Sequence, residues 1–468
     1  MGLTRLSSEV MKSLLIVTII YLLNLTELFA QNNQLRGWKA GVAKVVITPQ
    51  QRLWMAGYAM RNKPSEGIIH DLKAKAIYLE DSCGEKALLV TADILGFSKV
   101  VSDRIRDTLK SKMGLSKAQI LLNSSHTHSG PVLSEALTTI YPMNSDQLKN
   151  VEHYTEWLIK QIVNLAIEAK LNIEPVKLYS KNGVVRFQVN RRNNQESSLL
   201  KLSELKGPND FAVPVIKIAD AKGVIKAIVF GYACHPTVLN GYQWSGDYPG
   251  FAQIELEKIY PGTLALFMQG AGADQNPMPR KTLSLAMQYG KELAVAVERV
   301  INENMDELEP KLATCYTEID LPFQKLYSIK QLEKTTKSTV FYENKWAYQM
   351  LDKINKKESI STLYPYPLQA WRLGNQLLIS LGGEVLIDYS IQFKRIFGES
   401  VFVLGYSNDV MGYIPSELVL HEGGYEGYSS FMVYDLPAPW KSGIEKRIID
   451  GMILLERNLV FNSSNTSK

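Results

Sequence analysis

Several protein classes are excluded by what this chain lacks. Its 468 residues include only three cysteines, Cys83, Cys234 and Cys315, which are far apart and odd in number. A dense disulfide framework and a cysteine-rich zinc cluster are therefore excluded, and we expect buried free thiols. The net charge is only +5, and the Lys and Arg residues are scattered along the chain. Nucleic-acid binding needs a clustered basic surface, so we expect no nucleic-acid partner.

Long apolar runs are also absent after the first thirty residues. Residues 13–25 read SLLIVTIIYLLNL, with Arg5 and Lys12 before them and the small residue Ala30 after them. This order is typical of a secretory signal peptide, and the run is short for a membrane span. We expect a signal peptide at residues 1–30, a polar leader at 31–36 and an exported mature protein, periplasmic or extracellular, without a membrane span.

The remaining chain has an ordinary globular composition, with 46% hydrophobic and 21% charged residues. Apolar runs bounded by turn residues predict strands at 41–49, 74–80, 86–94, 176–180, 184–189, 213–218, 224–232 and 263–269, and a strand pair at 364–381. Helical spacing predicts helices at 145–170, 281–304, 327–357 and 440–458. We expect one α/β unit over residues 37–460, a multilayer sandwich of mixed β-sheets flanked by helices, and a flexible tail at 461–468.

Two of the six histidines lie together in the segment HTHSGP, two residues after the apolar run AQILLN. In an extended backbone, residues i and i+2 point to the same side, so His126 and His128 are expected to face one pocket. A pair of imidazoles there suits metal binding. The alternative is a pair of surface histidines with local hydrogen bonds.

Three further predicted strands also run into polar residues. One ends at CHP, which contains His235 and is followed by an expected loop, GDYPG. Another ends in GAGADQNP, where small residues allow a close approach of the backbone to a ligand. The third ends in GGE, where Glu384 is expected to open a helix. The alternatives are a packed core histidine, an ordinary turn and a carboxylate that favours a helix N-terminus. If these alternatives do not apply, two histidines and one glutamate are expected to form the ligand set of a catalytic zinc site at the strand ends.

Other families with an HxH motif do not fit. The metallo-β-lactamase pattern HxHxDH is absent, because Ser129 and Gly130 follow His128. A dinuclear amidohydrolase needs two more histidines and an aspartate, and the remaining histidines do not supply them. Among these, His153 falls inside a predicted helix.

A series of motifs, in order, resembles the neutral, non-lysosomal ceramidase family. The series is GVAKVVITP, MAGY, HTHSGP, NRR, CHP with GDYPG, GAGADQNP, GGE, and GYIPSE followed by GGYEG. It covers most of residues 40–430, and HTHSGP is its most specific element.

The resemblance implies a secreted hydrolase with one zinc ion per chain, in which metal-activated water cleaves the amide bond of an N-acylsphingosine. The implied zinc ligands are His126, His235, Glu384 and Tyr413. The implied catalytic residues are His128, Arg191 and Tyr425, and the implied substrate-binding residues are Gln275 and Asn276.

The chain departs from the family in two respects. Asn276 stands where the family carries a serine with an assigned catalytic role, and an amide can only donate or accept hydrogen bonds. The family also continues into a β-sandwich domain, whereas this sequence stops soon after a predicted helix.

Two alternatives therefore stay open: a zinc hydrolase of another amide or ester, such as an acylated sugar, and a non-catalytic ligand-binding relative. A deep apolar slot beside His126 favours a lipid. An open polar cleft lined by Gln275, Asn276, Arg280 and Tyr425 favours a sugar.

Overall fold

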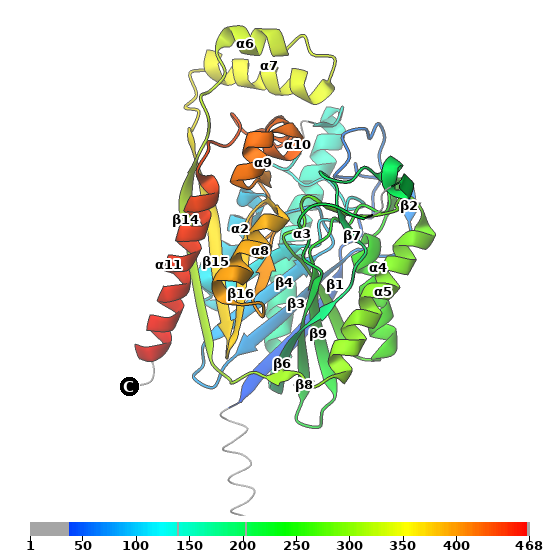
Figure 1. The fold of residues 1–468 in the computed structure, drawn as a ribbon, viewed down its shortest axis with the longest axis vertical. Helices are drawn as coiled ribbons and strands as arrows, with labels where there is room; N and C mark the ends of the chain where they lie inside the picture. The colour runs from blue at the N-terminus through cyan, green and yellow to red at the C-terminus, as the bar shows by residue number, and fades with distance from the viewer. Residues whose placement is uncertain (1–36, 138–139, 202–203, 466–468) are drawn as a thin grey trace, which may run out of the picture.

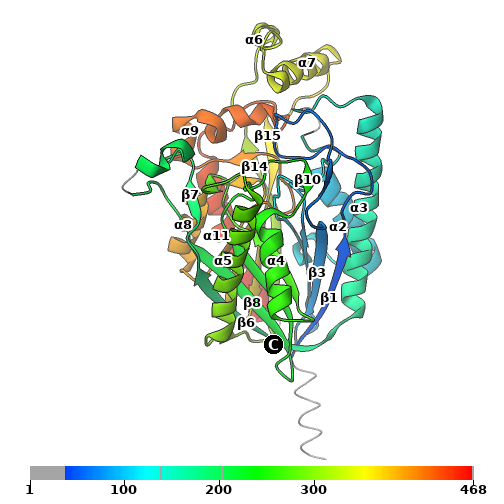
Figure 2. The same cartoon turned by 90° about the vertical axis from the view of Figure 1, so that its right-hand side faces the viewer.

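Two mixed β-sheets pack face to face between outer helices (Figures 1 and 2). The computed structural model describes residues 37–137, 140–201 and 204–465, so the predicted signal peptide and polar leader lie outside the described residues. The larger sheet has nine strands in the order β11-β9-β8-β6-β1-β3-β4-β5, with β13 beside β6. These strands are β1 (Trp38–Val46), β3 (Lys73–Glu80), β4 (Lys86–Ala92), β5 (Ile120–Ser124), β6 (Glu174–Val184), β8 (Ala212–Asp220), β9 (Ile225–Tyr232), β11 (Leu264–Gln269) and β13 (Asp306–Glu307).

The second sheet has four strands in the order β14-β15-β16-β18. They are β14 (Leu312–Pro322), β15 (Leu363–Leu373), β16 (Gln376–Leu381) and β18 (Phe402–Leu404). Both sheets are mixed, because β4 and β5, β9 and β11, and β16 and β18 pair in parallel while the other neighbours pair antiparallel. Three short pairs lie outside the sheets: β2 (Gly67–Ile68) with β10 (Gln243–Trp244), β7 (Gln188–Asn190) with β12 (Gln275–Pro277), and β17 (Glu384–Val385) with β19 (Tyr413–Ile414).

Alternation along the strands separates the core into layers. On β3, Ala76 and Tyr78 pack under the helices, whereas Ile77 and Leu79 pack against the second sheet, as the two-residue period of a strand requires. Helices α2 (Lys99–Met113), α3 (Ser145–Leu171), α4 (Asp247–Ile259) and α5 (Leu283–Asn302) cover the larger sheet. Helices α8 (Ile387–Phe397) and α11 (Ile444–Asn465) cover the smaller one. The sequence therefore predicted the fold class correctly.

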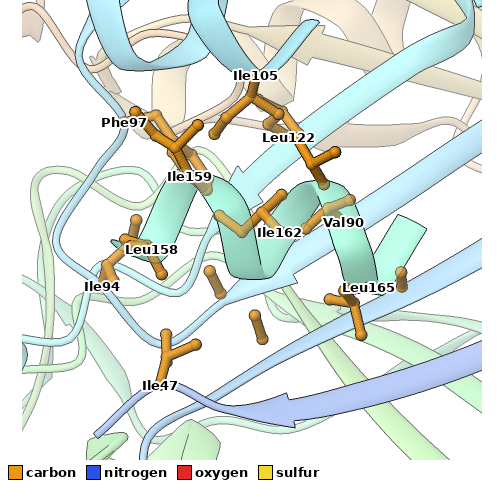
Figure 3. Packing of buried hydrophobic residues seen from close by; sticks show 14 of the residues in the cluster. Ile47, Val90, Ile94, Phe97, Ile105, Leu122, Leu158, Ile159, Ile162 and Leu165 are labelled. Atoms are coloured by element: carbon orange, nitrogen blue, oxygen red, sulfur yellow. The ribbon is translucent and has the colours of Figure 1, made fainter. Parts of the chain in front are cut away.

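Helix α3 shows how one face of a helix closes the core. Its residues Leu158, Ile159, Ile162 and Leu165 are buried and point at the sheet, toward Val90 and Leu122 among others (Figure 3). A capping box formed by Asn144 and Gln147 begins the helix. The predicted helix at 145–170 is confirmed. Trp157 on this helix is 37% exposed, and its ring packs on that of Tyr154.

The structure differs from the predicted elements in several places. Helix α2 and strand β14 were not predicted, because each presents only one apolar face between charged residues. GDYPG is not a loop, since α4 begins at Asp247. Glu384 lies in the short strand β17, and helix α8 begins three residues later. The last helix runs to Asn465, into the expected tail.

Four short helices lie at one end of the molecule: α6 (Ile329–Thr335), α7 (Phe341–Asn355), α9 (Glu417–Glu422) and α10 (Gly424–Gly427) (Figure 1). None of the helices in the described part of the chain combines the length and apolarity that a bilayer crossing needs.

Candidate metal site and active-site cleft

The polar segments that follow the strands meet where the two sheets join. Asn123, in β5, ties them together. Its side-chain amide donates to the carbonyl of Gln269 at 3.4 Å and to that of Gly405 at 2.9 Å, and its Oδ1 accepts from the Gln269 N–H at 2.8 Å. These buried bonds hold the exits of β5, β11 and β18 in one place.

His126 and His128 converge, but not through an extended backbone. Strand β5 ends at Ser124, and His126 has a φ of +61°, in the left-handed region. The Nε2 atoms of the two rings lie 3.2 Å apart. The sequence thus predicted the shared pocket, while the turn that creates it is a strained backbone position.

Two imidazoles are held so that Nε2 faces the cluster. His126 Nδ1 lies 2.6 Å from the Leu95 carbonyl oxygen, and His235 Nδ1 lies 3.2 Å from that of Gly272. A carbonyl only accepts, so each Nδ1 carries the proton and donates it. Each Nε2 then presents a lone pair, which is the tautomer that binds a metal. Burial lowers the pKa of His235 to about 4, which keeps this ring neutral at pH 7.

The glycines and alanines of GAGAD allow close packing between the segments that follow the strands. A Cβ at Gly272 would lie 2.4 Å from the backbone carbon of Ala233, so only glycine fits there. The close approach brings the Gly272 carbonyl to His235. These small residues were expected to admit a ligand, but they admit the neighbouring chain segment.

Glu384 completes the cluster. Its Oε2 lies 3.3 Å from His126 Nε2 and 3.1 Å from His235 Nε2, and all three side chains are buried. The Tyr434 hydroxyl donates to Oε1, and the Tyr406 hydroxyl lies 3.5 Å from Oε2. Burial alone would raise the pKa of Glu384, but His126 and His235 hold it well below the ordinary value.

The cluster fits a divalent metal ion. His126, His128 and His235 can each offer a ligand atom, and these atoms lie within 4.8 Å of one another. His235 Nε2 is buried and has no properly directed hydrogen bond within the described residues. Imidazole and carboxylate donors are those of catalytic zinc sites. Two ligand sets are open: the three histidines, or His126 and His235 with Glu384.

Arg191 connects the cluster to the surface. Its Nη2 donates to the Tyr413 hydroxyl at 3.0 Å and its Nε to Glu426 Oε1 at 2.8 Å. Tyr413 pairs through its backbone with Glu384, and burial raises the pKa of its phenol well above the ordinary value although Arg191 opposes this. Glu426 is buried and pairs with both Arg191 and Arg192.

A polar cleft of about 820 Å³ opens beside these residues. It is lined by Arg191, Arg192, Asn194, Gln195, Glu196, Ser197, Asn276, Met278, Arg280, Lys281, Tyr425 and Glu426. Asn276 Oδ1 accepts from Arg191 Nη1 and Thr237 Oγ1, each at 3.5 Å. The structure differs from the prediction at Gln275, which is buried and donates to the Pro208 carbonyl, so it does not line the cleft.

The other polar residues noted in the sequence have structural roles. Asp247 accepts from the N–H groups of Val238, Leu239 and Tyr248, which makes it a cap for the loop after His235. His70 lies 3.0 Å from the Ser245 hydroxyl, and His153 and His421 are exposed. Cys83, Cys234 and Cys315 are free thiols, of which only Cys234 is buried.

A family model now decides the relationship. Residues 38–275, half of the chain, match the model described as neutral/alkaline non-lysosomal ceramidase, N-terminal. The chain belongs to this ceramidase family. The match contains His126, His128, Arg191 and His235, whereas Glu384 comes from the segment that follows it.

Curated relatives agree with this ceramidase assignment. Neutral ceramidase B of Dictyostelium discoideum is 26% identical over 246 residues, which are 48% of this chain and 33% of the relative. Neutral ceramidase 1 of Arabidopsis thaliana is 24% identical over 281 residues, which are 58% of this chain and 35% of the relative. The matched part therefore spans about a third of the length of these relatives.

Solved structures show that the ceramidase fold extends beyond the matched half. The crystal structure of neutral ceramidase from Pseudomonas aeruginosa superposes with a TM-score of 0.67 at 18% identity, covering 90% of this chain and 75% of that chain. A structure titled ceramidase complexed with C2 gives a TM-score of 0.69 at 17% identity, with 90% and 76% coverage. At these identities the likeness establishes the fold.

Two tyrosines of this ceramidase-family site escaped the sequence analysis. Tyr406 packs on His126, with ring centroids 4.3 Å apart, and Tyr434 donates to Glu384. Tyr406 follows β18 in the stretch VFVLGYSND, an apolar strand running into polar residues like the other four. That pattern could have identified it. Tyr434 lies in a turn with no comparable signal.

The MAGY motif supports His128, which leads to a stability prediction. Gly57 has a φ of +100°, and a Cβ there would lie 2.4 Å from His128 Cγ. We expect Gly57→Ala to lower the free energy of unfolding by roughly 2–4 kcal/mol, from overpacking and backbone strain together. Urea unfolding measures this. Gly84→Ala is the matched control, since Gly84 has a φ of +86° but nothing within 4 Å. Equal losses in both variants would show that contact with His128 contributes nothing.

Proposed function

We propose that this protein is a zinc-dependent hydrolase that cleaves an amide bond of an N-acylated substrate. The observation that carries the proposal is the convergence of two Nδ1-anchored imidazoles on the Glu384 carboxylate in a chain of the ceramidase family. His126, His235 and Glu384 would hold the metal, with Tyr413 as the fourth ligand. When bound, zinc would supply a Lewis acid that polarises a carbonyl and activates water.

The protein groups around the cluster supply positioning and proton transfer. His128 is neutral, because burial lowers its pKa well below the ordinary value, so its Nε2 can accept a proton from the attacking water. Arg191 and Tyr425 donate hydrogen bonds to the oxygen on which negative charge develops. Asn276 cannot lose a proton, so it cannot act as a nucleophile in place of the family's serine, and its role would be to orient the substrate.

Ceramide is the first substrate candidate. The relatives carry the name neutral ceramidase. A second cavity, of about 530 Å³, reaches Leu95 and Tyr434, which contact His126 and Glu384. Leu133, Val410, Met411 and Leu436 contribute apolar walls to it. An amphiphile with an apolar chain and a polar head suits a cluster that lies between this cavity and the polar cleft.

An acylated sugar is the second candidate, and the polar cleft favours it. Asn276, Arg280 and Tyr425 line this cleft, as expected for an enzyme that binds a hydroxyl-rich group. Tyr425 is 41% exposed, and its ring gives such a group a surface to pack on.

The deciding experiment is fatty-acid release from a short-chain fluorescent ceramide by the zinc-loaded mature protein, with His126→Ala alongside. We expect release by the wild type and none by the variant. An acylated sugar is assayed in parallel. If the folded, zinc-containing wild type cleaves the acylated sugar but not ceramide, the second candidate replaces the first. If it cleaves neither substrate, the proposal is contradicted.

His128→Ala separates the two ligand sets. If Glu384 completes the site, this variant keeps zinc with an affinity within about tenfold of the wild type and loses turnover by ~100-fold or more, as expected for a general base. Zinc content after dialysis and turnover of the same substrate are the two measurements. Loss of zinc together with turnover would instead assign His128 to the metal.

We also propose that residues 1–30 direct export and that residues 37–460 form one catalytic domain. The apolar run behind two basic residues supports the first part. The two sheets share buried core residues, which supports the second. Amino-terminal sequencing of the protein recovered outside the cytoplasm tests the cleavage site after Ala30.

A further inference from the structure

Helices α6 and α7 form a hairpin that projects beyond the rest of the molecule, at the end that carries α9 and α10 (Figures 1 and 2). One side of this hairpin is firmly packed. Leu332, Trp346, Ala347 and Met350 are buried, and the Trp346 indole N–H donates to the Leu436 carbonyl at 2.9 Å. Trp346 and Phe431 pack edge to face, with centroids 5.2 Å apart. One side of the hairpin is therefore fixed against the rest of the protein, and the other side is exposed.

The free side carries large apolar side chains. Ile329, Phe341 and Tyr348 are 53%, 48% and 58% exposed. Phe341 and Tyr348 are seven residues apart on α7, so they share one face of that helix. A group of exposed large apolar residues on a projecting element marks an interaction surface.

The hairpin is positively charged together with the residues that flank it. Residues 325–358, which include α6, α7 and these flanking residues, contain eight lysines and four acidic residues, a net charge of +4, while the whole chain has +5. Lys330 and Lys334 lie on α6 and Lys337 follows its C-terminus; all three are exposed and make no ion pair within the described part of the chain. This charge is complementary to an anionic partner.

We propose that the α6–α7 hairpin docks this protein on an anionic lipid bilayer. Apolar side chains beside unpaired lysines are the composition of interfacial elements, in which the apolar groups enter the headgroup boundary and the lysines meet lipid phosphates. The Tyr327 and Tyr428 hydroxyls lie 2.8 Å apart and tie the hairpin to the segment that carries Tyr425. Docking would thus hold the mouth of the polar cleft next to the bilayer. This inference does not depend on which substrate is cleaved.

Co-sedimentation of the mature protein with vesicles tests the proposal. Vesicles of phosphatidylglycerol mixed with phosphatidylcholine are compared with pure phosphatidylcholine, at low and at physiological ionic strength. We expect binding to the anionic vesicles only, weakened by salt. Replacing Lys330, Lys334 and Lys337 by glutamine is expected to weaken partitioning by roughly 100-fold, from about 1 kcal/mol per lysine. Phe341→Ser with Tyr348→Ser is expected to weaken it in both salts.

The matched control removes the same charge elsewhere, as Lys110→Gln, Lys170→Gln and Lys222→Gln. These lysines are exposed on α2, on α3 and in the turn after β8. Equal binding to neutral vesicles, equal loss in the control, or full binding by the hairpin variant would each overturn the proposal. Self-association that the hairpin variant abolishes in the absence of vesicles would assign the surface to a second copy instead. Turnover of a soluble substrate should be the same in all variants, so a failure of the proposed chemistry remains distinguishable.

Discussion

Glu384→Gln is expected to abolish zinc binding at concentrations that saturate the wild type, with a loss of affinity of at least ~100-fold. The substitution removes the carboxylate charge that faces His126 and His235 while keeping the shape of the side chain. At zinc concentrations near 1,000 times the dissociation constant, the wild type should gain about 4 kcal/mol in free energy of unfolding. The variant should gain almost nothing. Thermal unfolding with zinc and with a chelator measures both.

Glu426→Gln is the matched control for this prediction. Glu426 is also a buried carboxylate of the site, but it pairs with Arg191 and Arg192 rather than with the histidines. We expect this variant to keep its stabilisation by zinc. An unchanged zinc response in Glu384→Gln would remove Glu384 from the metal site and leave the three histidines as the ligand set.

Asp409 should make the metal-free protein progressively less stable as the pH rises from about 4 to about 7. Burial raises the pKa of Asp409 to about 7, from an ordinary value of 3.8, although the Tyr364 hydroxyl donates to it at 2.6 Å. In this range Asp409 is more protonated in the folded state than in the unfolded state, so its contribution to the free energy of unfolding falls with pH. The full pKa difference of this group corresponds to about 4 kcal/mol. Asp247 and Asp274, whose pKa values burial raises to about 6, act in the same direction. His235 and His128, whose pKa values burial lowers, act in the opposite direction.

Asp409→Asn should remove the contribution of this group to the pH dependence and make the protein more stable than the wild type above pH 7. The asparagine oxygen can still accept from Tyr364. Urea unfolding in a chelator, at pH values from 4 to 8, tests the expectation. Glu156→Gln serves as the control, since Arg104 lowers the pKa of this exposed carboxylate, opposite to the shift of Asp409. A pH dependence in Asp409→Asn equal to that of the wild type would contradict the assignment.

Sequence patterns predicted the elements whose apolar positions repeat strongly. Strands such as β3 and helix α3 bury one face along their whole length, and their periods are visible in the residues alone. Helix α2 and strand β14 escaped because their buried positions are few and lie among charged or half-buried residues. GDYPG and GGE were given the wrong local structure, since turn-forming residues fit both a loop and the start of an element.

In the candidate site, too, the sequence located residues that a local pattern marks and did not locate contacts between distant residues. The sequence located His126, His235 and Glu384, because each follows an apolar strand, and a strand end is a place where polar side chains can converge. It did not locate Tyr434 or the buried pairing of Glu426 with Arg191, because these contacts join residues 50 and 235 positions apart and leave no local pattern.

The sequence by itself determined the α/β class, the family and the residue types that could hold a metal. These properties depend on local periods and on motifs that survive without knowledge of distant contacts. Only the tertiary structure decided which nitrogen of each imidazole faces the cluster, since the Leu95 and Gly272 carbonyls come from other segments. It also decided that Gln275 points away from the cleft and that the α6–α7 hairpin stands free. Hydrogen bonds and burial between remote segments create these features, and no local pattern encodes them.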